Sequence, residues 1–514
     1  MSSNHFVDRR RFLTGVAGTA LVAGAWPRSS AHAAVGQGVL KISTIGLDVS
    51  DFHRHTGSIG VPQVIAETLV GIGKDGAATP FLAERWDISE DGRTYRFMLR
   101  SNVKFHNGRV LTSKDIAANI ERIRDKVKGG WLTSTFKTVE ALDTPDDKTL
   151  VLRLQQPFSP LINLMAEMWI VAPESPGWNE TITKPICTGP FVFENWQPQV
   201  KLFAPAFADY WMPGKPKVAA VQFDLTDLAD ASLALRAGDF HIASIEQNKV
   251  ETVERDPKTR VVYRHDTGWA FWSFNNRKPR PPFDNIKVRQ AIAFAMDKPA
   301  LAKVFGGSVA VVTNQMVAPG NFYFDEAMHA ADPHKKADLA RGKKLLADEG
   351  VDPTKVTVNV VSAESERFNA PSLQMLRQLG FKVENRTYDD LGYQKALSAY
   401  DWDLFPGSSG PRADVYLRYV RLMSDGPNPG LWGGIQDAEL DAMIRTATSA
   451  VDGPKRKAAY DRAMQRVLDR YYFLPIAHAR GAYGVRRDIQ GFEPGFTYAL
   501  HGPDFGVANV SIPA

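Results

Sequence analysis

The sequence predicts an α/β protein with more than one domain. Strand patterns are followed by helix patterns: apolar residues stand at every second position of residues 95–99, and Ile116, Ile120 and Ile123 then recur at helical spacing. The chain has 514 residues, of which 44% are hydrophobic, so it can bury several cores. No low-complexity linker divides it. We therefore expect domains that interleave, with the chain crossing between them more than once.

Further elements along the chain support this class. Residues 40–46 and 149–154 have strand patterns, and leucines occupy alternate positions of the second. Thr112 stands at an N-cap position with Asp115 three residues later, which predicts that a helix begins there. An apolar stripe within residues 288–295 predicts a second long helix. The predicted strands and helices thus alternate along the whole chain.

The N-terminus has the pattern of an export signal. Arg9 and Arg10 precede an apolar pair, a weakly apolar run covers residues 15–25, and a small-residue site ends at Ala33. This order predicts a twin-arginine signal peptide over residues 1–33 and a soluble, periplasmic mature protein. The alternative is a basic tail with a chance arginine pair. The apolar run is shorter than the ~20 residues that a membrane-spanning helix needs.

Charge and cysteine content exclude two classes. The net charge is +5, but residues 1–33 contribute four arginines and one aspartate, so the remainder is nearly neutral and no nucleic-acid surface is indicated. Cys187 is the sole cysteine, which excludes a disulfide framework. We expect it to be a small buried apolar residue.

Two blocks of sequence carry a family resemblance. Residues 80–123 form the first, PFLAERWDISEDGRTYRFMLRSNVKFHNGRVLTSKDIAANIERI. The second has a Thr-Gly-Pro turn at residues 188–190, then Tyr210-Trp211, then Gly-Lys-Pro at residues 214–216. In order and spacing these blocks resemble the extracytoplasmic solute-binding proteins of family 5, the peptide, nickel and opine-type binding proteins of ABC importers. The resemblance covers nearly everything after Ala34.

The resemblance implies a two-lobed periplasmic binding protein fold of the class II type, with an extra domain and the ligand between the lobes. By analogy the first lobe comprises residues 36–70, 187–275 and 478–514. The extra domain comprises residues 71–186, and the second lobe residues 276–477.

The resemblance also implies a function. We expect a periplasmic substrate-binding protein that captures a peptide, or a peptide-sized modified amino acid or opine-like solute, and delivers it to the permease subunits of an ABC importer at the inner membrane. It implies a monomer that is not an enzyme, and we expect no cofactor. The alternatives are a nickel or metal-chelate carrier of the same family and, from another class, an exported hydrolase.

Three motifs compete with this interpretation. Residues 71–76 fit the G-x-G-x-x-G phosphate loop, but Pro80 follows too soon for a helix to begin, and the family has a hairpin turn there. His53 and His55 could hold a metal, although two ligands do not complete a metal site. The alternative is that they are exposed loop histidines or hydrogen-bonding groups at the cleft edge. Residues 407–410 lack the serine spacing of a hydrolase elbow.

The expected ligand site lies on segments that the resemblance places at the cleft. Trp269, Phe271 and Trp272 lie on a segment that crosses between lobes, with Asn275 close behind, and each aromatic could either contact ligand or be core. The full set of expected ligand-binding residues is Trp269, Phe271, Trp272, Asn275, Arg367, Ser408, Ser409, Arg412, Asp414, Trp432 and His53.

One departure from the family pattern concerns ligand charge. Ser409 stands where peptide-binding relatives carry the aspartate that pairs with the ligand amine, so a free amino terminus loses its anchor unless Asp414 supplies the charge from a shifted register. Arg412 and Arg367 could pair with a carboxylate through a bidentate fork. We therefore expect anionic ligands with a blocked or displaced amine to be preferred over plain peptides.

Overall fold

The structure is a computed structural model whose chain divides into two compact units, Met1–Ala34 and Val35–Ala514. It describes residues 38–44, 47, 49–54, 60–73, 76–127, 131–226, 230–364, 366–427, 429–451, 453–495 and 500–513. The predicted signal peptide and His55 lie outside these residues, and everything below concerns the second unit.

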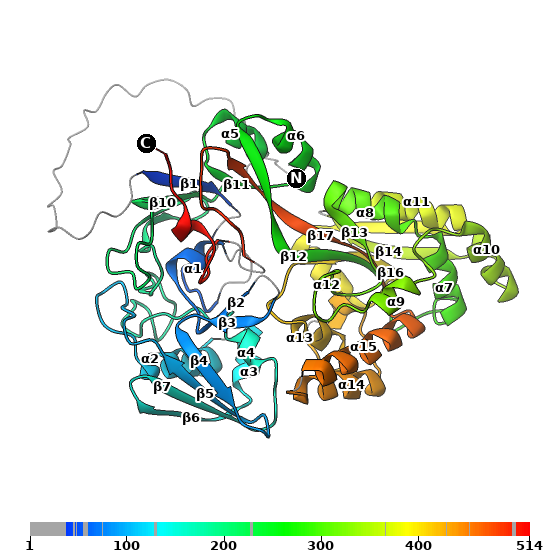
Figure 1. The fold of residues 1–514 in the computed structure, drawn as a ribbon. Coiled ribbons are helices and arrows are strands. Elements are labelled where there is room, and N and C mark those ends of the chain that lie inside the picture. The colour runs from blue at the N-terminus through cyan, green and yellow to red at the C-terminus, as the bar shows by residue number, and fades with distance from the viewer. Residues whose placement is uncertain are drawn as a thin grey trace, which may run out of the picture. The chain divides into compact units, whose positions relative to one another are not determined.

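A single mixed sheet runs through this unit (Figure 1). Its strands are β1 (Val39–Ser43), β8 (Glu194–Gln197), β9 (Lys201–Pro205), β10 (Ala220–Asp224), β11 (Ile242–Ile245), β12 (Thr259–Phe274), β13 (Ala310–Val312), β14 (Thr357–Ala363), β15 (Lys382–Tyr388), β16 (Leu404–Ser409) and β17 (Phe473–Arg486). They are ordered β15-β14-β16-β12-β17-β11-β1-β10-β9-β8, and β13 also pairs with β17. We call the part built on β1 and β8–β11 the first lobe and the part built on β14–β16 the second lobe.

Two long antiparallel strands, β12 and β17, join the lobes. The end of β12, from Trp269 to Phe274, pairs with β16 of the second lobe, whereas the end of β17, from Ala482 to Val485, pairs with β11 of the first lobe. The two strands pair with each other along nearly their whole length, from Thr259 opposite Arg486 to Ser273 opposite Phe473, with register shifts after Tyr263 and after Ala270. The chain therefore crosses between the lobes, as expected for a two-lobed fold.

A separate four-stranded antiparallel sheet, in the order β4-β5-β7-β6, belongs to the N-terminal part of the unit (Figure 1). Its strands are β4 (Ala83–Ile88), β5 (Thr94–Leu99), β6 (Val139–Asp146) and β7 (Thr149–Leu154), and the small hairpin β2 (Val70–Ile72) and β3 (Ala78–Pro80) precedes them. The G-x-G-x-x-G pattern of residues 71–76 begins in β2 of this hairpin. Helix α2 (Ser113–Asp125) packs on the sheet. The Asp115 carboxylate accepts from the Thr112 N–H at 2.8 Å, which confirms the predicted helix start.

Helices surround both lobes. They are α1 (Gly60–Ile65), α2 (Ser113–Asp125), α3 (Trp131–Phe136), α4 (Leu161–Leu164), α5 (Ala231–Ala237), α6 (Val250–Arg255), α7 (Ile286–Ala295), α8 (Lys298–Gly306), α9 (Glu326–Ala330), α10 (Leu339–Asp348), α11 (Asn369–Leu379), α12 (Asp390–Ala399), α13 (Tyr416–Tyr419), α14 (Ala438–Ser449) and α15 (Gly453–Arg470). Short 3-10 turns are η1 (Gln247–Lys249), η2 (Gly307–Val309), η3 (Pro353–Lys355), η4 (Val420–Leu422), η5 (Pro429–Trp432) and η6 (Val507–Asn509). No described helix is long and apolar enough to cross a membrane.

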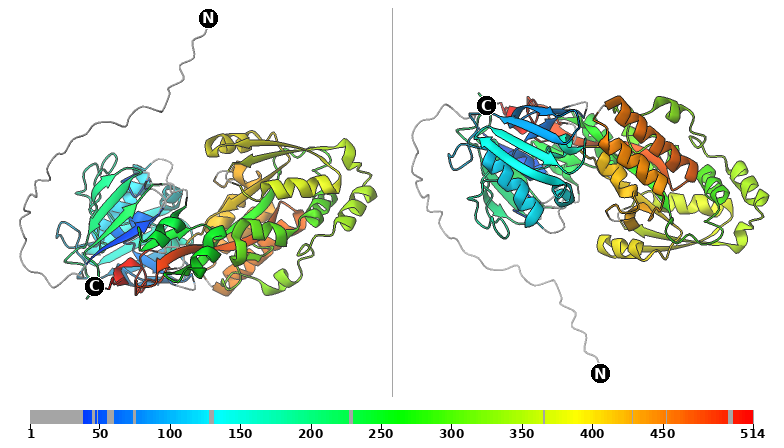
Figure 2. Two further views of the ribbon diagram at one scale, coloured as in Figure 1. Left: turned by 90° about the horizontal axis from the view of Figure 1, so that it is seen from above. Right: turned by 90° about the horizontal axis from the view of Figure 1, so that it is seen from below.

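The second lobe has one helical layer on each face of its sheet. Because side chains alternate along a strand, Trp269 and Phe271 of β12 face the core formed with α14 and α15, whereas Trp272 faces the opposite core formed with α7 and α11. Figure 2 shows the orange helices in front when the unit is seen from below and the green and yellow helices when it is seen from above. The crossing strand thus divides its aromatic side chains between two layers.

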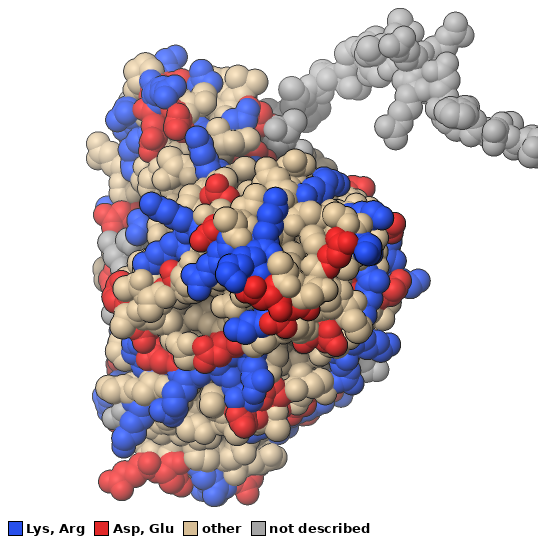
Figure 3. Space-filling view, turned by 90° about the vertical axis from the view of Figure 1, so that its right-hand side faces the viewer, with Lys and Arg blue, Asp and Glu red and all other residues tan. Residues whose placement is uncertain are grey.

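Charges are mixed on the end of the unit that carries α7 and α10. Figure 3 shows acidic and basic side chains interspersed there, with no large area of one sign. This face therefore offers no continuous basic surface.

Candidate functional site

An aromatic cluster lies at the second-lobe ends of the crossing strands β12 and β17. The indole of Trp269 stacks on that of Trp432 from η5, with centroids 5.9 Å apart and planes at 22°. Phe271 also stacks on the Trp432 indole, with centroids 5.0 Å apart, and the ring centroid of Phe473 from β17 lies 5.7 Å from that of Trp269. Alternation along β12 brings Trp269 and Phe271 to this face.

Both indoles keep an unused hydrogen-bond donor. Trp269 and Trp432 are 0% and 2% exposed, yet among the described residues neither Nε1–H has an acceptor. A buried donor without a partner costs about 1–3 kcal/mol, so such groups are rare in a finished core. An acceptor brought from outside the chain would satisfy them.

A group of arginines adjoins these indoles. The Arg421 guanidinium lies 5.4 Å from the centroid of the Trp432 ring. Burial, together with the positive charges of Arg412 and Arg418, lowers the pKa of Arg421 to about 9, and Glu167 is the carboxylate that opposes this shift. Arg421 thus lies among two other guanidiniums and one carboxylate in a partly desolvated place, where a further anion would stabilise its charge.

Glu167 reaches this group from the N-terminal part of the chain. It follows α4, and its Oε1 accepts from the Ala413 N–H at 3.2 Å, while Asn163 Nδ2 donates to the Ala413 carbonyl at 3.2 Å. Nearby, the Ser159 N–H donates to the Thr448 carbonyl at 2.8 Å. These contacts join the segment around α4 to the second lobe, so the arginine group lies at the junction of the two parts.

Asp414 lies next to this group but is already paired. Its side chain is fully buried; Oδ1 accepts from Arg456 Nη2 at 2.5 Å and from the Tyr416 N–H at 2.7 Å. Its Oδ2 has no hydrogen-bond partner among the described residues. One carboxylate oxygen therefore stays available to a further donor.

The other residues predicted in this region have partners within the chain. Ser408 Oγ donates to Glu366 Oε1 at 2.6 Å, and Ser409 pairs with Trp269 where β16 meets β12. Arg367 forms an ion pair with Glu246 of the first lobe at 3.0 Å, and about half of each side chain is exposed. That pair joins the two lobes.

Trp272 and Asn275 lie away from the indole pair. Trp272 Nε1 donates to Ser372 Oγ at 3.0 Å in the opposite core. Asn275 donates to the carbonyls of Tyr400 and Trp402 and accepts from two backbone N–H groups, so it orders the loop after β12. Their predicted ligand contacts stay predictions.

His53 uses both ring nitrogens inside the chain. Nδ1 lies 2.7 Å from Arg122 Nη1, and Nε2 lies 2.9 Å from the Trp169 carbonyl. Burial, and then the Arg122 charge, lower the pKa of His53 to about 4. Among the described residues no group of three or more histidine, cysteine or acidic side chains could hold a metal ion. Cys187 is buried, as predicted.

Three members of the site were not predicted from the sequence: Glu167, Arg418 and Arg421. Glu167 is a lone charge in the otherwise apolar run LINLMAEMWIVA, and the two arginines stand three residues apart in YLRYVRLM. A charge isolated in an apolar run is a signal of a buried partner. It does not say which partner.

Comparison with known proteins adds to this geometry. The model of the bacterial extracellular solute-binding proteins, family 5 Middle, matches residues 77–428. Di/tripeptide-binding protein 1 of Pseudomonas aeruginosa (strain UCBPP-PA14) is 26% identical over 494 residues, which are 88% of this chain and 90% of that protein. Glutathione-binding protein GsiB of Shigella dysenteriae serotype 1 (strain Sd197) is 27% identical over 487 residues, 89% of this chain and 93% of that protein.

A solved structure shows the same fold. It is AgaA from A. tumefaciens R10 in complex with agropinic acid, with a TM-score of 0.75 and 24% identity over 93% of this chain and 99% of that chain. The two-lobed class predicted from the sequence is confirmed.

Proposed function

The chain belongs to the bacterial extracellular solute-binding proteins of family 5, the binding proteins of ABC importers, and we propose that its solute is peptide-sized and anionic. We propose that a carboxylate of this solute occupies the space between Trp269, Trp432 and Arg421. The observation that carries this proposal is that two buried indole N–H groups have no acceptor among the described residues, while Arg421, whose pKa is lowered by burial and by two neighbouring arginines, lies over the Trp432 ring.

The chemistry of this group selects an anion. A carboxylate offers four acceptor positions, enough for two indole N–H groups and a guanidinium together. Hydrogen bonds to an ionised group contribute about 1.5–3 kcal/mol each, roughly twice the contribution of neutral ones. A neutral amide could accept from the indoles but would leave the excess positive charge unbalanced. We therefore expect affinity to depend on the carboxylate.

The amine end of the solute supports the same class. Ser409 brings no charge to the place where peptide-binding relatives carry an acid, and it lies on a strand beside Trp269. Agropinic acid in the AgaA complex and the glutathione named for GsiB are examples of peptide-sized acidic solutes. We favour solutes of this type, with a blocked or displaced amine.

A plain peptide is the second candidate, and one observation favours it. Asp414 Oδ2 is buried without a hydrogen-bond partner among the described residues, and it could accept from a ligand ammonium. Against this, Oδ1 of the same carboxylate is held by Arg456, which already balances its charge. An ammonium would therefore compete with an existing ion pair.

A thermal-shift panel tests the proposal. The probes are agropinic acid, glutathione, an N-acetylated tripeptide, the same tripeptide with a free amine, and nickel with histidine. A probe at a hundred times its dissociation constant adds about 2.7 kcal/mol of stability, which raises the melting temperature measurably. We expect the acidic or amine-blocked probes to stabilise the protein more than the free tripeptide. Stronger stabilisation by the free tripeptide that Asp414→Asn abolishes would favour the second candidate. A shift with nickel and histidine but with none of the other probes would favour the metal-chelate carrier.

We also propose the finer points of location and mode of action. The chain is exported by the twin-arginine route, works as a monomer in the periplasm, and binds its solute without turnover. Replacing Arg9 and Arg10 with lysine should leave precursor in the cytoplasm. Normal periplasmic yield of that double variant would show that another route suffices.

A further inference from the structure

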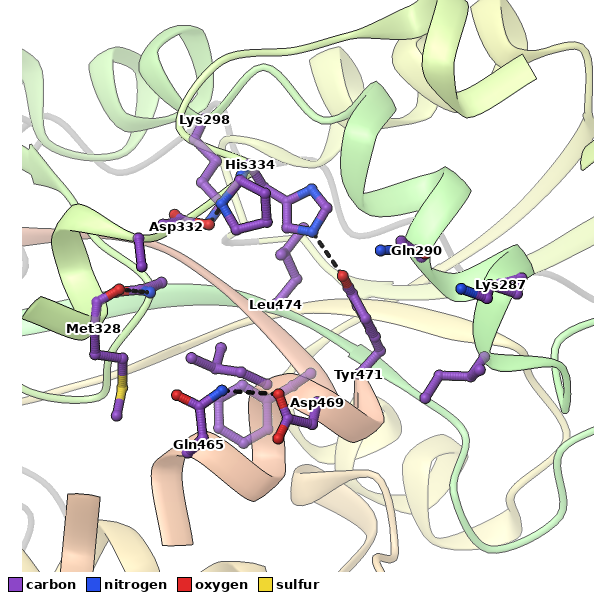
Figure 4. Close-up of a pocket in the computed structure, with 16 residues that line it drawn as sticks. Lys287, Gln290, Lys298, Met328, Asp332, His334, Gln465, Asp469, Tyr471 and Leu474 are labelled. Atoms are coloured by element: carbon purple, nitrogen blue, oxygen red, sulfur yellow. Dashed lines mark hydrogen bonds and ion pairs between the residues drawn. The ribbon is translucent and has the colours of Figure 1, made fainter. Parts of the chain in front are cut away.

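A cavity lies in the second lobe, and Phe473 and Leu474 of the crossing strand β17 form part of its wall. It has a volume of about 330 Å³ and is enclosed by α7, the start of α8, the segment after α9 and the end of α15. Figure 4 shows Lys298, Asp332 and His334 on one side of it and Gln465 and Asp469 on the opposite side. One water occupies roughly 30 Å³ in the liquid, so the cavity has room for more than isolated waters.

Two buried side chains on its wall have unused hydrogen-bonding capacity. Asn314 is 2% exposed and its Oδ1 has no partner among the described residues, although its Nδ2 donates to the Met328 carbonyl at 2.9 Å. His334 is 4% exposed, with Nε2 2.8 Å from the Tyr471 hydroxyl and Nδ1 without a partner among the described residues. Such buried orphan groups call for a polar occupant.

Lys298 adds spare donors. Its side chain is 0% exposed, and the one hydrogen bond that its ammonium makes among the described residues is to Asp332 Oδ2 at 2.9 Å. An ammonium has three donors, so two remain for an acceptor in the cavity. The Asp332 charge balances the Lys298 charge, so the buried wall is neutral overall and presents both donors and acceptors. Neither an anion alone nor a cation alone matches it.

The remaining wall is apolar. Phe473, Leu474, Leu468 and Met328 line the same cavity. An apolar wall beside a neutral set of donors and acceptors fits a ligand with a hydrocarbon body and a zwitterionic head.

We propose that this cavity binds a free apolar α-amino acid of about the size of leucine. Its carboxylate accepts from the Lys298 ammonium, its ammonium donates to Asn314 Oδ1, and its side chain packs against Phe473 and Leu474. The cavity shares Phe473 with the aromatic cluster beside Trp269, but Lys298 and Asn314, which hold the charged groups of the amino acid, do not belong to the solute site.

The test is a titration of the full mature protein with L-leucine, followed by calorimetry. Two variants fill the cavity from its rim and keep its buried polar groups: Ala331→Trp and Gln465→Trp, both at exposed positions that line it. Ala327→Trp is the matched control, because Ala327 is exposed on α9 but does not line the cavity. Arg421→Met separates this site from the solute site.

We expect L-leucine to bind the unmodified chain, Ala327→Trp and Arg421→Met alike, and to lose affinity at least about tenfold in both filling variants. Leucinol, which lacks the carboxylate, and 4-methylpentanoic acid, which lacks the ammonium, should each bind about tenfold more weakly or worse, since each loses one charge-assisted hydrogen bond. The proposal would be overturned if L-leucine bound both filling variants as tightly as the unmodified chain, or if Arg421→Met alone lost binding. A crystal soaked in L-leucine that shows only water in the cavity would also overturn it.

Discussion

Two groups of arginine behave differently in this protein. Arg122, whose side chain is 1% exposed, donates to both oxygens of the buried Asp51 carboxylate at 2.6 and 3.1 Å, to His53 Nδ1, and to the Trp178 carbonyl at 2.7 Å. Arg421 lies among Arg412 and Arg418, with Glu167 as the opposing charge. The contacts of Arg122 all lie within the chain, whereas the two indole N–H groups of the Arg421 region have no acceptor among the described residues.

The difference separates structure from binding. Buried charges persist when their partners belong to the chain, and Arg122 ties α2 to the loop that carries Asp51 and His53 in this way. In the Arg421 region the two indole N–H groups have no acceptor among the described residues, and we propose that the solute supplies one. We therefore interpret the first group as part of the scaffold and the second as the place of the solute.

The largest expected effect is on the complete group. Arg122→Ala leaves the Asp51 carboxylate buried without its partner, which should lower the free energy of unfolding by about 3–5 kcal/mol. Urea unfolding measures it, and solute affinity of the folded protein should not change. A loss below about 1 kcal/mol would show that the Arg122 group does not stabilise the scaffold.

Arg421→Met should have the opposite signature. Removing one of three neighbouring guanidiniums relieves repulsion, so the free energy of unfolding should change by less than about 1 kcal/mol, while affinity for an acidic solute should fall about 10- to 100-fold. Arg445→Met is the control, because Arg445 forms an exposed ion pair with Asp425 on the surface. If the control weakens binding as much, the effect is one of general charge rather than of the site.

A pH titration extends the comparison to the neutral histidines of the scaffold. Burial lowers the pKa of His106 to about 4, and its Nε2 lies 3.0 Å from the Gly189 carbonyl. Between about pH 6.5 and pH 4 the unfolded chain binds a proton that the folded chain does not, so stability falls as the pH falls, by up to about 1.4 kcal/mol per pH unit.

His106→Asn removes this group, so its unfolding free energy should depend less steeply on pH over that interval than that of the unmodified chain. Urea unfolding at several pH values measures both slopes. Equal slopes would mean that His106 is already protonated in the folded protein or does not titrate in the unfolded one.

The smallest expected effect compares two tryptophans of one strand. Trp269→Phe and Trp272→Phe lose the same volume, but only Trp272 Nε1 has an acceptor, Ser372 Oγ. Trp272→Phe should therefore cost about 1 kcal/mol more in unfolding free energy than Trp269→Phe. Solute affinity should fall in Trp269→Phe and not in Trp272→Phe. The reverse pattern would place the solute on the other face of β12.

Much of the fold could be predicted from the sequence, because local patterns and family blocks report it. The capping pair Thr112 and Asp115 begins α2, and the apolar stripe of residues 288–295 lies in α7, which is buried at nearly every one of these positions. The resemblance placed Trp269, Phe271 and Trp272 on a segment that crosses between the lobes. The sequence could not say which face held the site.

The rest depends on contacts between distant segments. Glu167 and Ala413 are 246 positions apart, and their hydrogen bond exists only because α4 meets the second lobe. Arg421 has no motif of its own, and its lowered pKa arises from burial and from neighbours that the fold assembles. The spacing of these residues along the sequence does not indicate that they come together. The predicted lobe boundaries and ligand contacts stay predictions.

The central claim is that the Arg421 group selects a carboxylate, and one calorimetric measurement tests it most directly. Two ligands that differ only at one group, an N-acetylated tripeptide and its C-terminal amide, are titrated into the unmodified chain and into Arg421→Met. We expect the unmodified chain to bind the acid at least about tenfold more tightly than the amide, and Arg421→Met to lose most of that preference. Equal affinity of the unmodified chain for acid and amide, or a preference that persists undiminished in Arg421→Met, would contradict the account.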